Sequence, residues 1–282
     1  MLNTDIWLTE YYEDAIGHTF KIKRNLYHAV SKFQTIDIVE TDYYGCMLLL
    51  DGMVMTTEND EFIYHELITH IPLLSHHAAK KVLIIGDGDG GVAREILKYP
   101  HITEITVCEI DKMVIDACKK YLPVTASGFD SSRVNVQVKD GTEYIAQFKK
   151  HFDIIIIASA DPVGPGEGLF KMEFYQNVFA ALTDNGIMVN QSASPWSMQD
   201  QFKNINKSLT NIFPIVKPYI SVVPTYPGSF WSWTFCSKNI EPLSNINKPL
   251  AKKISESCKF YNPEIHKAVF ALPNFIKDLL TG

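Results

Sequence analysis

The sequence predicts an α/β protein in which a small antiparallel β domain precedes a Rossmann-like domain. The strongest observation is the segment Lys81–Gly91, where an apolar strand runs into a glycine-rich turn and a helical pattern follows over Val92–Lys98. Strand-like and helical runs alternate after this point, which is typical of an α/β sheet. Residues 1–76 are therefore interpreted as the β domain plus a connecting helix, and residues 77–282 as the Rossmann-like domain.

The N-terminal β domain is predicted from short β-prone runs that turn signals separate, such as those at 44–45 and 51–52. A helix should follow over 58–74, because apolar residues recur there at spacings of three and four. The β-prone runs are Thr19–Lys23, Tyr27–Val30, Thr35–Val39 and Cys46–Leu50.

The strands of the second domain are predicted from longer apolar runs. Phe152–Ile157 is almost uninterrupted, which indicates a strand buried on both faces of a parallel sheet. The last segment, 262–280, is expected to mix helix with a break at Pro273. The remaining predicted strands are Glu104–Glu109, Val134–Val138, Gly186–Gln191, Ile215–Val223 and Phe230–Cys236.

The glycine-rich turn carries an unusual charge. Gly86, Gly88 and Gly91 satisfy the pattern G-x-G-x-x-G, so a dinucleotide is one interpretation. Asp87 and Asp89, however, would repel its phosphates and would attract a ligand that is cationic near the turn. A tight β–α turn with solvated acids is the structural alternative, and it accounts better for Asp87 than for Asp89.

Acidic residues also follow the next strands of the predicted sheet. In α/β sheets ligands bind at the carboxyl ends of the strands, so these side chains should surround one site. An acid at Glu109 can accept hydrogen bonds from ribose hydroxyls, and Asp140-Gly141 could reach the adenine side. Taken in order, Asp89, Glu109, Asp140 and Asp161 indicate a site for a nucleoside that carries a positive charge.

Composition excludes several function classes. The net charge of -6 and the pI of about 5.8 argue against nucleic acid as a main partner, and they allow a polycationic substrate. The chain has no apolar run long enough to span a membrane and no signal peptide, so no membrane partner is expected. The five cysteines form no C-x-x-C motif and indicate reduced thiols in the cytoplasm.

A metal site is not predicted. The predicted first helix contains His65, Glu66 and His70, but a helical zinc site needs histidines at i and i+4, and these two lie five apart on different faces. From composition alone, Tyr64 and His65 are interpreted as packing or capping residues more readily than as ligands.

Motifs that carry a family resemblance run through nearly the whole chain. They are Trp7–Glu10, Gln34, Asp51-Gly52, Thr57–Glu66, His70–Leu74, Val82–Gly91, Glu109–Asp111, Tyr121–Pro123, Asp140-Gly141, Asp161–Pro165, Leu169-Phe170, Pro224–Pro227 and Tyr261–Pro263. In this order the chain closely resembles the polyamine aminopropyltransferases, and among them the bacterial spermidine synthases. The segments Tyr64–Glu66, Asp161–Pro165 and Pro224–Tyr226 make the resemblance specific, because methyltransferases in general lack them.

The resemblance implies a catalytic domain with a class I methyltransferase-type sheet and a defined reaction. The co-substrate would be decarboxylated S-adenosylmethionine, with no permanently bound cofactor. An amine of putrescine would attack the carbon beside the sulfonium, giving spermidine and methylthioadenosine. Because the donor carries two positive charges, its chemistry agrees with the acids in the glycine-rich turn. The resemblance also implies a homodimer or homotetramer that associates through the N-terminal sheet.

The resemblance also assigns site residues by position. Tyr64 and Asp161 are expected at the reacting atoms, and Pro165 is expected in a gating loop over 163–169, whose glycines permit closure. The donor would be bound by Gln34, His65, Gly86, Asp89, Glu109, Asp140, Gly141 and Pro165. The amine would be bound by Tyr64, Asp161, Gln191 and Tyr226.

Three positions depart from the family pattern. Ala158 stands where the family has the aspartate that accepts the proton, Met55 where it usually has glutamine, and Asp87 where it usually has glycine. We therefore expect slow turnover with donor binding retained. Three interpretations stay open: an active spermidine synthase, a homologue with the same pocket but impaired or altered activity, and an S-adenosylmethionine-dependent methyltransferase.

Overall fold

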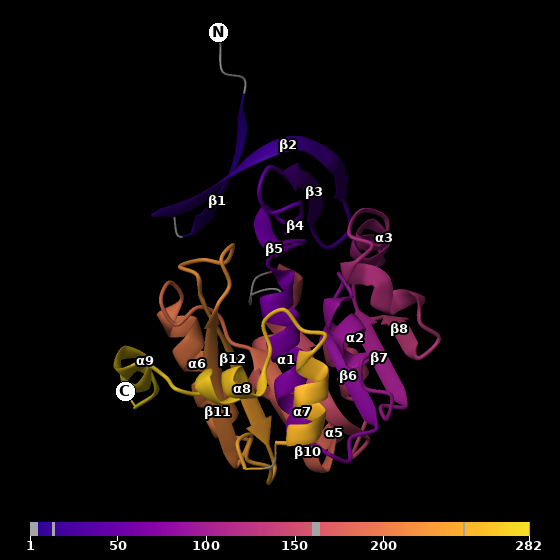
Figure 1. Cartoon of the computed structure of the whole chain (residues 1–282), viewed down its shortest axis with the longest axis vertical. Helices are drawn as coiled ribbons and strands as arrows, with labels where there is room; N and C mark the ends of the chain where they lie inside the picture. The colour runs from indigo at the N-terminus through magenta and orange to yellow at the C-terminus, as the bar shows by residue number, and fades with distance from the viewer. Residues whose placement is uncertain (1–4, 13–14, 160–163, 245, 282) are drawn as a thin grey trace.

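Two β-sheets lie one above the other in the computed structural model, which describes residues 5–12, 15–159, 164–244 and 246–281 (Figure 1). The N-terminal sheet is antiparallel, and its strands follow one another in chain order. Its strands are β1 (Ile6–Tyr12), β2 (Ile16–Val30), β3 (Thr35–Thr41), β4 (Cys46–Leu50) and β5 (Met53–Thr57).

The N-terminal sheet confirms the predicted antiparallel architecture but corrects its details. The two runs predicted at Thr19–Lys23 and Tyr27–Val30 form one long strand, β2. Register shifts against β3 occur between Ile22 and Arg24 and between Asn25 and Tyr27, so the polar residues between the runs bulge out without ending the strand. Strand β1 was not predicted from its own pattern, and it pairs with the first half of β2.

The second sheet has seven strands in the order β11-β12-β10-β9-β6-β7-β8. Strands β6 to β10 are parallel to one another, and β12 pairs antiparallel with both β10 and β11. Chain order reverses where β6 lies beside β9, and ligands bind at such switch points. The strands are β6 (Lys81–Gly86), β7 (Glu104–Glu109), β8 (Val134–Val138), β9 (Phe152–Ala158), β10 (Leu182–Gln191), β11 (Ile215–Val222) and β12 (Phe230–Ser237).

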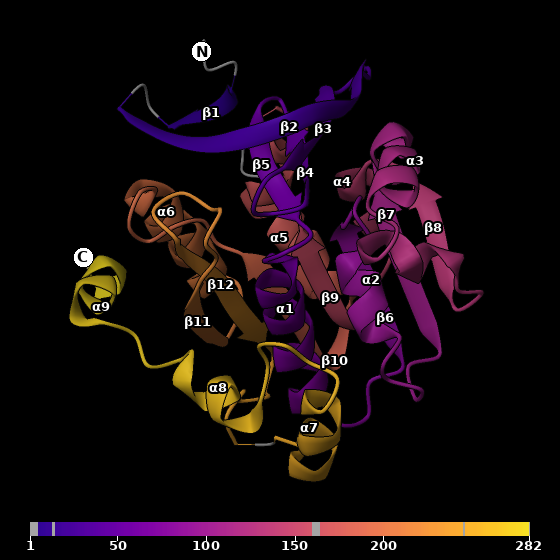
Figure 2. The same ribbon diagram turned by 45° about the horizontal axis from the view of Figure 1, so that its top comes forward.

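Helices cover both faces of the second sheet, as Figure 2 shows for α1 on one face and α5 on the other. Successive residues of β9 alternate between the two cores: Ile154 and Ile156 belong to the α1 side, and Ile155 and Ile157 to the α5 side. This two-sided burial confirms the predicted α/β fold class. The helices are α1 (Glu61–Ser75), α2 (Gly91–Ile96), α3 (Lys112–Tyr121), α4 (Gly141–Ile145), α5 (Met172–Ala181), α6 (Gln199–Thr210), α7 (Lys248–Ser255), α8 (Pro263–Ala268) and α9 (Asn274–Thr281), with 3-10 turns η1 (Thr125–Asp130) and η2 (Gly164–Phe170).

Helix α1 joins the two sheets. It begins at Glu61, three residues later than predicted, because Thr57 and Asp60 form a hydrogen-bonded turn before it (2.6 Å). The other oxygen of Asp60 accepts hydrogen bonds from the backbone and hydroxyl of Thr225, which ties this turn to the β11–β12 connection. Nearly all of α1 is buried, and its apolar residues share a core with the second sheet. The proposed domain boundary between residues 76 and 77 therefore assigns α1 to the first domain although it packs on the second.

A separate apolar cluster packs the N-terminal sheet against α3. Ile36 and Ile38 of β3 and Leu48 of β4 contact Val114 and Cys118 on α3. The cluster fixes the position of the N-terminal sheet above the carboxyl ends of β6 and β7, since α3 directly follows β7. No helix among the described residues is long and apolar enough to cross a membrane.

The C-terminal segment is anchored by one buried carboxylate. Glu66 on α1 is 2% exposed and accepts hydrogen bonds from the backbone N–H groups of Lys259, Phe260 and Tyr261, at 2.7–2.8 Å. After this anchor the chain forms α8 and α9, with Pro273 in the break between them, as the sequence predicted.

Replacing Glu66 by alanine should destabilise the fold, because it leaves three backbone donors without their acceptor. Hydrogen bonds to a charged group contribute about 1.5–3 kcal/mol each and are not additive, so we expect a loss of about 2–4 kcal/mol in the free energy of unfolding. Urea denaturation followed by circular dichroism measures it. The exposed Glu143→Ala is the control, with an expected change within about 0.5 kcal/mol. Equal stability of the two variants would contradict the anchoring role.

Candidate functional site

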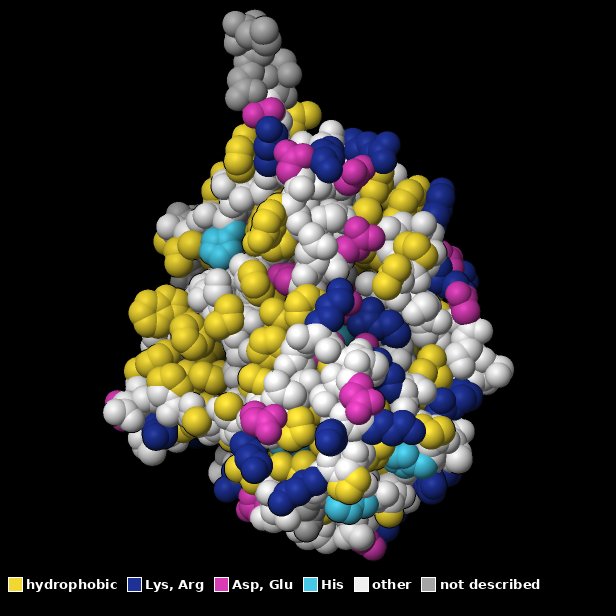
Figure 3. Space-filling view, in the orientation of Figure 1, with side chains coloured by type: hydrophobic (Ala, Val, Ile, Leu, Met, Phe, Trp, Pro, Cys, Tyr) yellow, Lys and Arg dark blue, Asp and Glu magenta, His cyan; other side chains and the backbone are white. Residues whose placement is uncertain are grey.

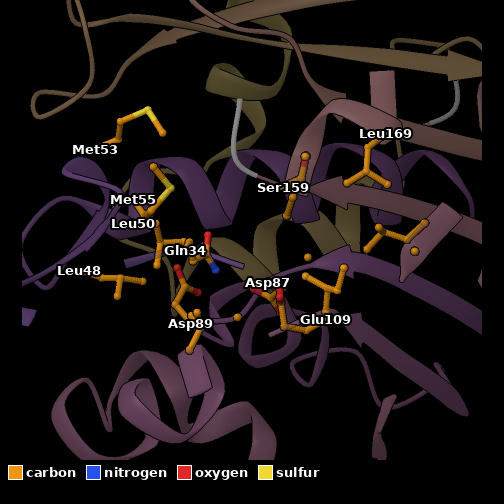
Figure 4. Close-up of a pocket in the computed structure, with 18 of the residues that line it drawn as sticks. Gln34, Leu48, Leu50, Met53, Met55, Asp87, Asp89, Glu109, Ser159 and Leu169 are labelled. Carbon is orange, nitrogen blue, oxygen red and sulfur yellow. The ribbon is translucent and has the colours of Figure 1, made fainter. Parts of the chain in front are cut away.

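A cavity of about 440 Å³ lies between the two sheets, at the carboxyl ends of β6, β7 and β9. Gln34, Leu48, Leu50, Met53 and Met55 line it from the N-terminal sheet and its connections. Figure 4 shows the acids Asp87, Asp89 and Glu109 in its wall, together with Gln34. The other lining residues come from α1, the β8–α4 turn, the end of β9 and the β11–β12 connection, and they include Tyr64, His65, Asp140, Gly141, Ala158, Ser159 and Tyr226.

Two glycines of the β6–α2 turn allow close approach of other elements. Gly86 has a φ of +87°, and a Cβ there would lie 2.3 Å from the carbonyl oxygen of Ala158. A side chain at Gly91 would overlap the ring of His65, at 2.3 Å. The turn is therefore built for contact with β9 and α1, and the glycines serve this packing rather than a bound pyrophosphate.

Asp87 is the residue of this turn that departs most from ordinary geometry. It has a φ of +68°, where residues with a side chain are rare, and it is only 5% exposed. Its carboxylate oxygens accept hydrogen bonds from the backbone of Val92 (2.8 Å) and Ala93 (2.9 Å). Burial, and then the nearby charge of Asp89, raise the pKa of Asp87 to about 8.

Asp89 belongs to a chain of ion pairs. His65 lies 2.5 Å from Glu61 through Nδ1 and 3.3 Å from Asp89 through Nε2, and Arg94 holds Glu61 with two hydrogen bonds. Burial alone would lower the pKa of His65, but Asp89 and Glu61 raise it well above its usual range. Burial opposes the charge of Asp89 too, yet His65 and the backbone N–H of Gly91 hold its pKa below the usual range.

Glu109 ends β7 and is oriented by the next turn. One of its oxygens accepts a hydrogen bond from the backbone of Asp111 (2.8 Å), and burial followed by nearby acids raises its pKa to about 7. Asp111 in turn caps α3 and binds the amide of Gln34 (3.2 Å), which links the N-terminal sheet to the same edge. Gly88 lies next to this carboxylate and packs against α3, because a Cβ at that position would lie 2.8 Å from Val114.

Asp140 and Gly141 form the start of α4 in the cavity wall. Asp140 caps the helix by accepting hydrogen bonds from the backbone (2.7 Å) and hydroxyl (2.6 Å) of Thr142. Gly141 is buried against Ile85, where a Cβ would come within 2.5 Å. Both positions predicted from the sequence therefore face the cavity, and glycine is needed at the second for packing.

A smaller cavity of about 40 Å³ adjoins the first. Tyr64, Tyr226, Met53, Met55 and Ser159 line both cavities, whereas Gln191, Tyr12 and Trp231 line only the smaller one among the described residues. The hydroxyl of Tyr226 donates to the carbonyl oxygen of Met55 (2.6 Å), and its ring contacts that of Tyr64 edge to face. Of the predicted residues, Gln34, His65, Gly86, Asp89, Glu109, Asp140 and Gly141 line the larger cavity, Gln191 the smaller one, and Tyr64 and Tyr226 both.

The end of β9 carries Ala158, whose register partner on β6 is Gly86. Ala158 lines the larger cavity and brings no ionisable group to it. Asp161 lies outside the described residues, as does the first residue of the predicted gating loop. The rest of that loop forms η2 with Pro165 in it, and Gly166 and Leu169 line the cavity.

The sequence did not predict the residues that support the acids. Glu61 and Arg94 orient His65, and Asp111 orients Glu109. The spacing of Glu61 and His65, four residues apart on one helix face, is a signal that could have indicated the first pair. The roles of Arg94 and Asp111 depend on tertiary contacts that no local pattern contains.

The two histidines of α1 point to different surroundings, as their spacing predicted. His65 faces Asp87 and Asp89, whereas His70 is buried with Glu95 (3.0 Å) and Cys258 (3.3 Å). Both groupings bring potential metal-ligand atoms within 4.8 Å of one another, and the sequence predicted neither grouping. In that second grouping Lys98 already pairs with Glu95 (2.6 Å).

Solved structures with the same architecture were found over nearly the whole chain. A spermidine synthase in complex with the transition-state analogue AdoDATO superposes with a TM-score of 0.96 at 42% identity, covering 98% of this chain and 95% of that one. The spermidine synthase of Thermotoga maritima gives 0.95 at 41% identity, covering 99% and 95%. The strand order and the cavity at the strand ends are therefore those of the methyltransferase-like class of α/β proteins.

Sequence comparisons identify the family within this fold class. Residues 61–248 match the spermine/spermidine synthase domain, and residues 6–58 match the spermidine synthase tetramerisation domain. A polyamine aminopropyltransferase of Caldicellulosiruptor saccharolyticus is 45% identical over 99% of this chain and 100% of its own, and one of Methanocaldococcus jannaschii is 44% identical over 97% and 94%. The chain belongs to the spermine/spermidine synthase family, the transferases of polyamine biosynthesis.

The raised pKa of Asp87 predicts a pH-dependent stability. Between its usual value and about 8 the folded chain holds a proton that the unfolded chain has lost, so this contribution to stability falls as the pH rises through that window. Asp87→Asn cannot titrate, so its melting temperature relative to the unmodified chain should increase by several degrees from pH 5 to pH 8.5. Thermal unfolding without ligand measures this, with the exposed Asp116→Asn as control. A difference that stays constant with pH would contradict the assignment.

Proposed function

We propose that this chain is a spermidine synthase that moves the aminopropyl group of decarboxylated S-adenosylmethionine to putrescine. The observation that carries the proposal is the set of carboxylates around a cavity large enough for a nucleoside, with Asp87, Asp89 and Glu109 in its wall. Such a wall disfavours phosphates and favours a donor that carries a sulfonium and an ammonium. The names of the relatives support the same reaction.

The donor would occupy the larger cavity. Glu109 would accept hydrogen bonds from the ribose hydroxyls, and Asp140 with Gly141 would bound the adenine. Asp89, which is held by His65 and by the N–H of Gly91, would pair with the propylammonium. Gln34, Gly86 and Pro165 would complete the donor site.

The acceptor amine would enter through the smaller cavity. Tyr64, Gln191 and Tyr226 would line its path, and Asp161 would fix it by charge. The aromatic walls suit the methylene chain of a diamine, whose amino groups alone need polar partners. The two chambers meet at Tyr64 and Ser159, so an amine in the small one would face a donor in the large one.

The proposed transfer depends mainly on the alignment of the reacting atoms. The attacking nitrogen and the departing sulfur must lie in line with the carbon between them, and holding them so replaces a bimolecular encounter. Closure of the segment that includes η2 would exclude water from the sulfonium carbon. Methylthioadenosine would then leave as the uncharged thioether, which loses the attraction of the acids.

Self-association through the N-terminal sheet is also proposed, as a homodimer or homotetramer. The match of residues 6–58 to a tetramerisation domain supports it, and so does the exposure of Ile6, Trp7 and Ile16 on β1 and β2.

On the face in Figure 3, basic and acidic side chains are interspersed, in keeping with the proposal that nucleic acid is not a partner.

One observation bears on each of the two alternative functions. Ala158 at the end of β9 favours a family member with impaired or altered turnover. A methyltransferase would need a donor that keeps its carboxylate, and Asp89 in the wall disfavours that group.

We expect the chain to bind methylthioadenosine but not NAD, and to release methylthioadenosine when given decarboxylated S-adenosylmethionine and putrescine. Calorimetric titration measures the binding, and chromatography of the reaction mixture measures the release. S-adenosylmethionine with its carboxylate is the matched control donor and should bind more weakly. Tight NAD binding without a response to methylthioadenosine would overturn the proposal.

Asp89→Asn should weaken the decarboxylated donor far more than methylthioadenosine, which lacks the propylammonium. Breaking one side of a buried charge pair costs about 3–5 kcal/mol, so the ratio of the two dissociation constants should change by roughly 10² or more. Glu109→Gln is the matched control, because both ligands carry the ribose and should weaken together. Equal losses for both ligands in Asp89→Asn would show that Asp89 serves the fold alone.

A further inference from the structure

Asp87 is a strained residue in the wall of the donor cavity. A φ of +68° is favourable for glycine and unfavourable for aspartate, and the neighbouring Gly86 has the same sign of φ. The chain therefore keeps a carboxylate where an unsubstituted glycine would fold more easily. Backbone strain of this kind persists at functional sites, where the side chain has a use that outweighs it.

The backbone of Asp87 lies beside the end of β9. Its backbone N–H donates to the carbonyl oxygen of Ala158 (3.1 Å), and the preceding Gly86 is the register partner of Ala158. Both residues line the larger cavity, next to Ser159, which also lines the smaller one. Its carboxylate lies at the start of α2, near His65 and Asp89, while its backbone lies beside the end of β9.

The other acids of the cavity have different partners. Asp89 is paired with His65, Glu109 accepts from the backbone of Asp111, and Asp140 caps α4 through Thr142. Asp87 accepts from two backbone amides of the described chain, one at each oxygen, so each oxygen keeps a lone pair for a further donor. Among these acids it is also the one whose backbone contacts β9.

We propose that Asp87 accepts the proton of the attacking amine, in place of a carboxylate at position 158. The inference rests on the proposed aminopropyl transfer. An ammonium of putrescine gives one proton to the Asp87 carboxylate, and the freed lone pair forms the new C–N bond. The C–S bond breaks with its electron pair going to sulfur, which leaves methylthioadenosine neutral and the product nitrogen as a secondary ammonium. Asp87 then releases its proton to water.

The surroundings of Asp87 suit this role. The charged and titratable groups that interact with it are Asp89 on its own turn, His65 on α1 and Cys118 on α3. Arg94 on α2 and Glu109 on β7 interact with Asp89 beside it. Asp89 and burial favour the protonated carboxyl, while the two positive charges of the donor would favour the ionised one.

Four chains test the inference: the unmodified chain, Asp87→Gly, Ala158→Asp and the double variant. Glycine at 87 removes the strain but also the acceptor of two backbone N–H groups, so thermal unfolding checks that this variant still folds. With decarboxylated S-adenosylmethionine and putrescine, Asp87→Gly should lower kcat by roughly 10²–10⁴, the usual contribution of a positioned base. Methylthioadenosine binding should stay within about threefold. Ala158→Asp should restore kcat in the Asp87→Gly background and add little in the unmodified one.

The pH profile separates a base from a structural residue. The unmodified chain should reach a plateau in kcat, whereas Asp87→Gly and Asp87→Asn should climb steadily toward alkaline pH as free amine becomes available. Asp87→Asn keeps an acceptor for one backbone amide, so full activity in this variant would overturn the inference. Equal gains from Ala158→Asp in both backgrounds would overturn it too, and leave the proposed function standing. If none of the four chains releases methylthioadenosine with putrescine, the proposed function fails, and the inference fails with it.

Discussion

Carboxylates outnumber the cations that pair with them in the wall of the larger cavity, and this imbalance governs the site. His65 is shared between Glu61 and Asp89, while Arg94 is engaged by Glu61. Asp87 and Glu109 have backbone amides as partners, and burial raises the pKa of both. A folded chain keeps such groups by binding protons or by binding a cation. A ligand with positive charge therefore reduces the unfavourable free energy of these buried carboxylates.

The backbone of the second sheet makes this concentration of charge possible. Parallel strands end at one edge, so the turns after β6, β7 and β8 bring Asp87, Glu109 and Asp140 to the same cavity. The helices that start there offer N–H groups to Asp87 and Asp140, and such N–H groups stabilise a negative charge. The same geometry would serve a phosphate if the turn carried no acids. Side chains in the turn, more than the fold, thus determine which ligand charge is favoured.

Much of this arrangement could be predicted from the sequence, and the exceptions have physical reasons. The strands of the second sheet were predicted because burial on both faces requires unbroken apolar runs, as in β9. The acids at the strand ends were predicted for the same reason, since the runs show where each strand stops. Strand β2 was predicted as two strands, because bulges allow polar residues inside one ladder. The partners Arg94 and Asp111 could not be predicted, because α1 and the N-terminal sheet reach them from distant parts of the chain.

The N-terminal sheet contributes to the cavity through its register. Met47 and Leu49 of β4 pack with Phe20 on one face, whereas Leu48 and Leu50 line the cavity on the other. A slip of one residue would exchange these faces. The β4–β5 connection prevents it, because Asp51 and Gly52 have φ values of +49° and +81°, which define a two-residue hairpin that pairs Leu50 with Met53. A local turn far from the acids therefore fixes Met53 and Met55 where the two chambers meet, and with them the space left for the amine.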